Sequence, residues 1–106
     1  MIDNSALAII TRCKLNGTLD NLTIDNSFNL LAQIQLYLIS NHIWVRNKDI
    51  VATVNDDSLT IVIVTGVNNL TITVDADNYV YQVNGIDTFD ELHNLLDWIF
   101  KSNEVN

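Results

Sequence analysis

The sequence is short of basic residues and of long hydrophobic runs, and each shortage excludes a class of protein. Five Lys and Arg stand against 13 Asp and Glu, which gives a formal net charge of -8. Sequence-independent binding to nucleic acid or to an anionic membrane needs clustered Lys and Arg. The longest apolar stretches, such as residues 59–64, are far shorter than the ~20 residues that span a bilayer. We therefore expect no direct contact with nucleic acid and no membrane insertion.

Cysteine and proline are also scarce. Cys13 is the only cysteine, so the chain cannot close an internal disulfide, and we expect a protein of the reducing cytoplasm. The first residues lack the basic segment and the long apolar run of a signal peptide, so we expect none. The absence of proline, together with abundant Asn and Ile, is typical of AT-biased coding, as in many bacteriophages.

The residues that are present predict one globular domain over residues 1–106. Hydrophobic residues make up 48% of the chain and charged residues 17%, so a chain of this length can bury a single core. We recognise no catalytic motif, metal motif or phosphate-binding loop in it. We therefore expect no enzymatic activity and no cofactor.

The N-terminal segment allows two interpretations. Residues 6–15 alternate in polarity, Asn16-Gly17 is the preferred pair for a type I′ turn, and residues 22–24 offer a return strand. This pattern predicts a β-hairpin, which we prefer. The alternative is a helix that starts at Asn4 or Ser5 and ends at Gly17.

The remainder predicts an α+β fold. Helical spacing of apolar residues predicts a helix over residues 27–40 with Ser27 as its cap, and Thr88 to Glu91 has the pattern of a capping box for a helix that runs to Lys101. Four β runs separated by turn residues lie between these helices, at residues 50–54, 59–65, 70–74 and 79–83. The predicted architecture is an antiparallel β-meander of four or more strands with two α-helices packed on one face.

Four carboxylates are predicted to gather at one rim of this sheet. In a meander the first and third turns fall at the same end, which brings together Asp56, Asp57, Asp75 and Asp77. Three interpretations stay open: solvated turns, a docking site for a basic protein, and a Ca²⁺ or Mg²⁺ site. The metal interpretation is the weakest of the three, because this segment lacks the glycine and the distal Glu of an EF-hand loop.

Two aromatic residues have unusual positions on the predicted helices. Trp98 points about 180° away from Phe89, which belongs to the predicted apolar arc of its helix, and Tyr37 occupies the equivalent angle on the earlier helix. Either the two helices lie side by side and these rings fill the crevice between them, or the rings form an exposed strip that binds a partner.

One pair of residues has the spacing of a catalytic contact. His93 and Asp97 are four residues apart, so they share a helix face, and an Asp can orient an imidazole. No recognisable turn places a nucleophile beside them, and we interpret the pair as solvated.

Taken together, these patterns predict a small acidic non-enzymatic protein-binding module. Residues 49–106 hold ten of the 13 acidic residues, so the negative charge belongs to the meander and the last helix. A partner with a basic surface is the expected ligand, and the most concrete form is an inhibitor or adaptor, encoded by a phage or other mobile element, that docks on a host protein. The alternative is a homodimeric structural or secretion-chaperone-like protein that holds a client.

Overall fold

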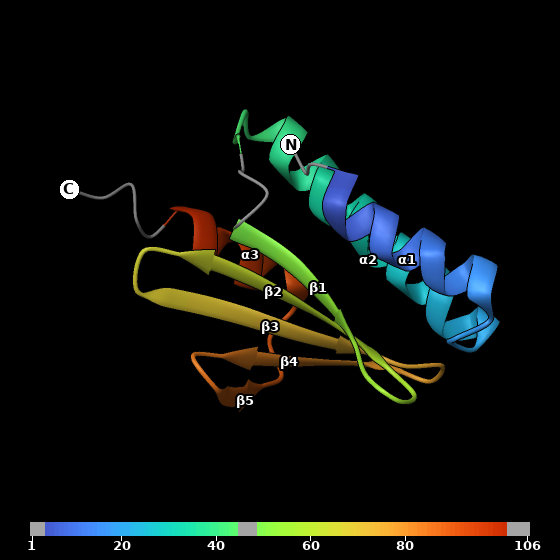
Figure 1. Ribbon diagram of the computed structural model, residues 1–106. Helices are drawn as coiled ribbons and strands as arrows, with labels where there is room; N and C mark the ends of the chain where they lie inside the picture. The colour runs from blue at the N-terminus through green and yellow to red at the C-terminus, as the bar shows by residue number, and fades with distance from the viewer. Residues whose placement is uncertain (1–3, 45–48, 102–106) are drawn as a thin grey trace.

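The described part of the chain forms three helices and one five-stranded sheet. The computed structural model describes residues 4–44 and 49–101, and Figure 1 shows their arrangement. The helices are α1 (Asn4–Asn16), α2 (Asn21–Ser40) and α3 (Leu92–Lys101). The strands are β1 (Ile50–Val54), β2 (Leu59–Thr65), β3 (Asn68–Val74), β4 (Tyr79–Val83) and β5 (Ile86–Thr88).

The sheet is an antiparallel meander in which every strand pairs with its neighbour in sequence, in the order β1-β2-β3-β4-β5. This confirms the predicted α+β fold and its meander. β1, β2 and β4 have the predicted bounds, and β3 begins two residues before the predicted strand. β5 was not predicted; it has only three residues and follows the tight turn at Asn84-Gly85, where both residues have positive φ.

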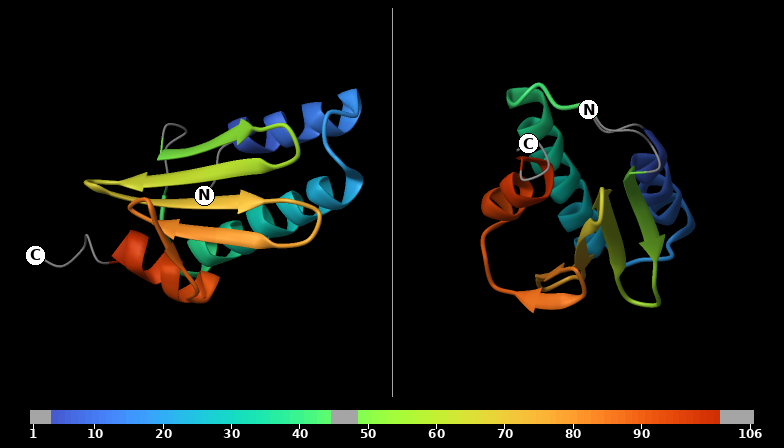
Figure 2. Two further views of the ribbon diagram at one scale, coloured as in Figure 1. Left: turned by 90° about the horizontal axis from the view of Figure 1, so that it is seen from below. Right: turned by 90° about the vertical axis from the view of Figure 1, so that its left-hand side faces the viewer.

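The core lies between one face of the sheet and the helices. Ile61 pairs with Ala52 on one side and with Ile72 on the other, and alternate residues along these strands point to the same face. These side chains are buried together with Ile34 of α2 and Leu96 of α3. Seen from below, the strands lie in front of α2, so the opposite sheet face is uncovered (Figure 2, left). None of the helices in residues 4–44 and 49–101 is long and apolar enough to cross a membrane.

The predicted N-terminal hairpin is wrong, because residues 4–16 form helix α1. Ala6, Ile10 and Cys13 lie at helical spacing and are buried against the rest of the core. The helix ends in a Schellman motif: Gly17 has a φ of 65°, and the N–H of Thr18 donates to the carbonyl of Cys13 at 3.1 Å. The pair Asn16-Gly17 therefore stops a helix here instead of turning a hairpin.

Two helix starts also differ from the prediction. α2 begins at Asn21, so the predicted cap Ser27 lies inside the helix, where its buried hydroxyl donates to the carbonyl of Thr23 at 2.8 Å. α3 begins at Leu92, because Thr88 is still part of β5 and the predicted capping box does not form. Phe89 consequently precedes the helix and does not join its apolar face.

Candidate functional site

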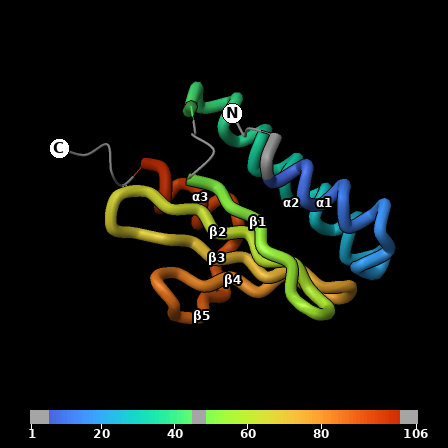
Figure 3. The backbone as a smooth tube through the Cα atoms, viewed as in Figure 1, coloured from blue at the N-terminus to red at the C-terminus, as the bar shows by residue number. Residues whose placement is uncertain are grey.

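The four predicted carboxylates meet at one end of the sheet. The β1–β2 and β3–β4 turns lie together there, and the connection between α1 and α2 lies next to them (Figure 3). A cavity of about 350 Å³ opens between these three segments. We call it the acidic cavity; its carboxylate residues are Asp20, Asp56, Asp57, Asp75 and Asp77. Asp20 lies in the connection between α1 and α2, at the N-cap position of α2. Because the predicted hairpin has no such helical connection, Asp20 was not predicted to lie near the other four carboxylates.

Hydrogen bonds fix the β3–β4 turn that carries two of these residues. Oδ1 of Asp75 accepts the backbone N–H groups of Asp77 and Asn78, both at 2.8 Å. The side-chain amide of Asn26 on α2 donates to the backbone carbonyl of Asp75 at 3.0 Å, and the backbone carbonyl of Asn26 accepts a hydrogen bond from the Tyr79 hydroxyl at 3.0 Å. Both ends of the turn are therefore tied to α2, which fixes the backbone that carries Asp75 and Asp77.

The charge of the acidic cavity is not compensated within the described part of the chain. The side chains of Asp56, Asp57 and Asp77 are exposed and make neither a hydrogen bond nor an ion pair with residues 4–44 or 49–101. Thr23 lines the same cavity, is fully buried, and its hydroxyl has no hydrogen-bond partner among the described residues. Like charges at one edge repel one another unless a cation offsets them. The cavity is thus a concentrated negative surface with a hydrogen-bonding group in its wall.

The described residues contain no group of three or more His, Cys, Asp or Glu side chains close enough to hold a metal ion. The carboxylates surround the cavity without a chelating geometry.

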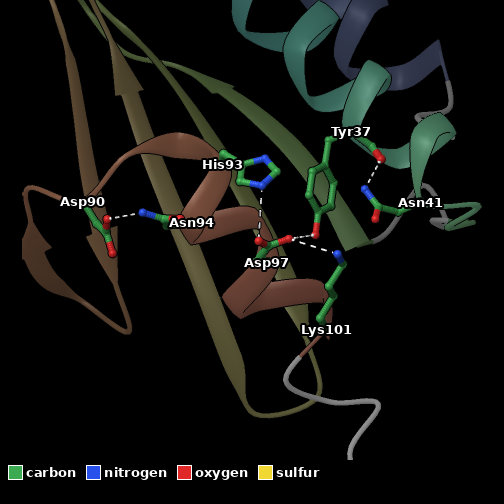
Figure 4. Close-up of polar contacts among 7 residues, drawn as sticks. All are labelled: Tyr37, Asn41, Asp90, His93, Asn94, Asp97 and Lys101. Carbon is green, nitrogen blue, oxygen red and sulfur yellow. Dashed lines mark hydrogen bonds and ion pairs between the residues drawn. The ribbon is translucent and has the colours of Figure 1, made fainter.

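Tyr37 lies between α2 and α3 (Figure 4). Its side chain is 6% exposed, and its hydroxyl donates to Oδ1 of Asp97 at 2.6 Å. The ring stacks on Phe100 with 6.1 Å between centroids and meets the edge of His93 at 5.7 Å. Of the two positions predicted for Tyr37, the structure therefore shows the crevice between helices, and a ring this deeply buried cannot serve as a surface anchor for a partner.

Asp97 is the centre of the polar contacts at this junction. Besides the Tyr37 hydroxyl, it meets Nε2 of His93 at 3.4 Å and Nζ of Lys101 at 3.3 Å. The hydrogen bond from Tyr37, followed by the hydrogen bond and charge of Lys101 and the charge of His93, holds the pKa of Asp97 below its usual value. The pair of His93 and Asp97 thus belongs to a set of contacts that fastens α3 to α2.

Trp98 is half-buried and packs against the hydrophobic core. It and Tyr37 do not form the exposed aromatic strip that was one of the two alternatives. The exposed aromatic side chains lie elsewhere: Phe89 is 100% exposed between β5 and α3, and Trp44 is 79% exposed after α2. Neither exposure was predicted, because Phe89 fits the apolar arc of a helix in the sequence and Trp44 belongs to no periodic segment.

No family model, curated protein or solved structure matches this chain.

Proposed function

We propose that this protein is a small, non-enzymatic protein-binding module that docks on a partner with a basic surface through the acidic cavity. Its most concrete form is an inhibitor or adaptor, encoded by a phage or other mobile element, that acts on a host protein in the cytoplasm. One observation carries the proposal: three separate segments bring five carboxylates to one cavity, and no described cation offsets the exposed ones.

Physical chemistry supports a protein as the ligand. A surface of one charge attracts a partner of the opposite charge over a distance of about one Debye length, ~8 Å at physiological salt. Such complementarity raises the association rate and rejects partners of the same charge. The carboxylates lie on turns that hydrogen bonds hold in place, so little order has to be imposed on them when a partner binds.

The test is affinity capture from cells of the encoding organism, followed by binding of the purified partner. Three bait proteins are compared: the wild type, the neutral variant Asp56→Asn/Asp57→Asn/Asp77→Asn, and its charge-conserving control with Glu at the same positions. We expect the purified partner to bind the wild type and the Glu control and to lose affinity for the Asn variant, with a steep dependence on salt. Equal binding to all three proteins, insensitive to salt, would exclude the acidic cavity as the docking site.

A second candidate function is the homodimeric structural or secretion-chaperone-like protein, and the uncovered sheet face favours it. The residues that point away from the helices on β1 to β4 carry no charge. Three of the valines among them, Val51, Val64 and Val80, are exposed. Exposed apolar patches of this kind mark interaction surfaces.

Size-exclusion chromatography with light scattering decides between the candidates. A dimer that dissociates when Val64→Lys and Val80→Lys are introduced would support the homodimer. A monomer at high protein concentration would exclude it and leave the docking module.

A further inference from the structure

Two Asn-Gly pairs occur in the chain, Asn16-Gly17 and Asn84-Gly85. An asparagine before glycine can react with its own main chain, because glycine has no side chain to shield its backbone nitrogen. Both pairs are exposed; the first ends α1, and the second forms the turn between β4 and β5. The same dipeptide thus stands in two different local structures, and the two can be compared within one molecule.

Hydrogen bonds hold the side chain of Asn84 at both of its polar atoms. Its Oδ1 accepts the backbone N–H of Asn69 at 2.8 Å, and its Nδ2 donates to Oδ1 of Asn68 at 3.2 Å. The backbone N–H of Asn84 also donates to the carbonyl of Asn69, at 3.0 Å. The side-chain amide is therefore tied to β3, and it must break its bonds before its carbon can turn toward the nitrogen of Gly85.

The side chain of Asn16 has no such restraint. It is exposed and makes no hydrogen bond with residues 4–44 or 49–101. The N–H of Gly17 donates to the carbonyl of Lys14 at 3.4 Å, which is longer than the ~2.7–3.2 Å usual for such a bond. Asn16 is also the last residue of α1, and the ends of helices fray. The side-chain amide can therefore rotate, and the glycine nitrogen beside it is only weakly held.

We propose that Asn16 deamidates spontaneously in the folded protein, whereas the fold protects Asn84. The backbone nitrogen of Gly17 loses its proton to solvent base, attacks Cγ of Asn16 and closes an imide ring. The side-chain nitrogen takes up a proton from solvent and leaves as ammonia. Water then opens the ring at either carbonyl and yields aspartate or isoaspartate. The net change is the uptake of water and the release of ammonia, with no oxidation or reduction.

Deamidation changes the end of α1. Either product places a carboxylate at the C-terminus of the helix, where the helix dipole disfavours negative charge. Isoaspartate also adds a carbon atom to the main chain, which shifts the N–H of Thr18 away from the carbonyl of Cys13 that it contacts in the Schellman motif. Because Thr18 lines the acidic cavity, the modification adds a charge and loosens the chain beside that cavity. The reaction itself does not depend on the docking role proposed for the cavity.

The test is incubation of the purified whole protein at mildly alkaline pH, below its unfolding temperature, followed by mass spectrometry of tryptic peptides. Cleavage after Lys14 and Lys48 places the two pairs in different peptides, and fragment masses locate the modified asparagine. Labelling with protein isoaspartyl methyltransferase detects the isoaspartate product. We expect Asn16 to react about tenfold faster than Asn84 or more, since each hydrogen bond of ordinary net strength slows the reaction roughly fivefold.

Two substitutions and an unfolded control complete the test. Asn16→Gln, whose longer side chain closes an imide ring far more slowly, should remove most of the methyltransferase signal, and the matched variant Asn84→Gln should keep the wild-type signal. In urea that unfolds the protein, both asparagines should react at similar rates, because only the folded structure distinguishes them. Equal rates in the folded protein, faster reaction at Asn84, or an Asn16 that stays intact while the unfolded protein reacts would each overturn the proposal. An undiminished methyltransferase signal in Asn16→Gln would overturn it too.

Discussion

The acidic cavity should destabilise the protein that carries it. Its carboxylates repel one another in the folded state, and this repulsion weakens when the chain unfolds and the three segments separate. The variant Asp56→Asn/Asp57→Asn/Asp77→Asn removes three charges whose side chains make no hydrogen bond in the described structure. Asp75 is kept because its carboxylate holds the β3–β4 turn, and Asp20 is kept because it lies at the N-cap position of α2. We expect the variant to be more stable than the wild type.

The size of the effect follows from the size of the cavity. A sphere of about 350 Å³ has a diameter of roughly 9 Å, so carboxylates on facing walls interact by about 0.5 kcal/mol per pair in water. Screening at 0.15 M salt reduces each pair to about a third of this value, since the Debye length is then ~8 Å. Removing three of the five charges removes nearly all of the like-charge pairs. The free energy of unfolding should rise by about 1 kcal/mol at 0.15 M salt and by about 2–3 kcal/mol at 0.01 M.

Urea and thermal unfolding, followed by circular dichroism at both salt concentrations, measure this difference. A gain of about 1 kcal/mol corresponds to a rise of roughly 4–8 °C in Tm for a domain of this size. The matched control carries Glu at the same three positions and should keep the wild-type stability and salt dependence, because it keeps the charge. An Asn variant that is no more stable than the Glu control at 0.01 M salt would refute the repulsion on which the docking proposal depends.

Three further predictions concern the contacts that hold the fold. Tyr37→Phe removes the largest cause of the lowered pKa of Asp97. A carboxylate whose pKa is lowered by folding stabilises the protein above its ordinary pKa, and this stabilisation is lost as the pH falls through the lowered pKa. Urea unfolding should therefore show that the variant is less stable than the wild type at pH 7 and loses less further stability between about pH 5 and pH 2. The same acid dependence of stability in both proteins would contradict this. Gly17→Ala should lower the free energy of unfolding by about 1–2 kcal/mol, because a residue with a Cβ is strained at this positive φ. The added Cβ meets no atom within 4 Å, so we expect no steric clash to add to this loss. Asn16→Ala should leave it unchanged or slightly higher, since that residue is helical, whereas thermal unfolding would show a loss for both variants if the segment were a hairpin. Ile72→Ala should lower the free energy of unfolding by about 2–5 kcal/mol in urea, because the side chain is fully buried in the middle of the sheet, and a loss below about 1 kcal/mol would place it outside the core.

Strands β1 to β4 were predictable because two independent signals agree on them. In β3, Leu70, Ile72 and Val74 alternate with polar residues, and they are buried as the alternation requires. The turn residues on either side set the limits of each strand. The position of the acidic rim follows from the meander alone, since successive turns alternate between the two ends of a sheet.

The first helix was not predictable from its own residues. In residues 6–15 the same apolar side chains fit a period of two and a period of 3.6, and Asn16-Gly17 is a good hairpin turn as well as a good helix end. Tertiary packing selects the helix over the hairpin, because Ile10 and Cys13 are buried in the same core as α2 and the inner face of the sheet. That partner surface exists only once the rest of the chain has folded, so no local pattern contains it. For the same reason, the position of Asp20 in the acidic cavity could not be predicted from the sequence.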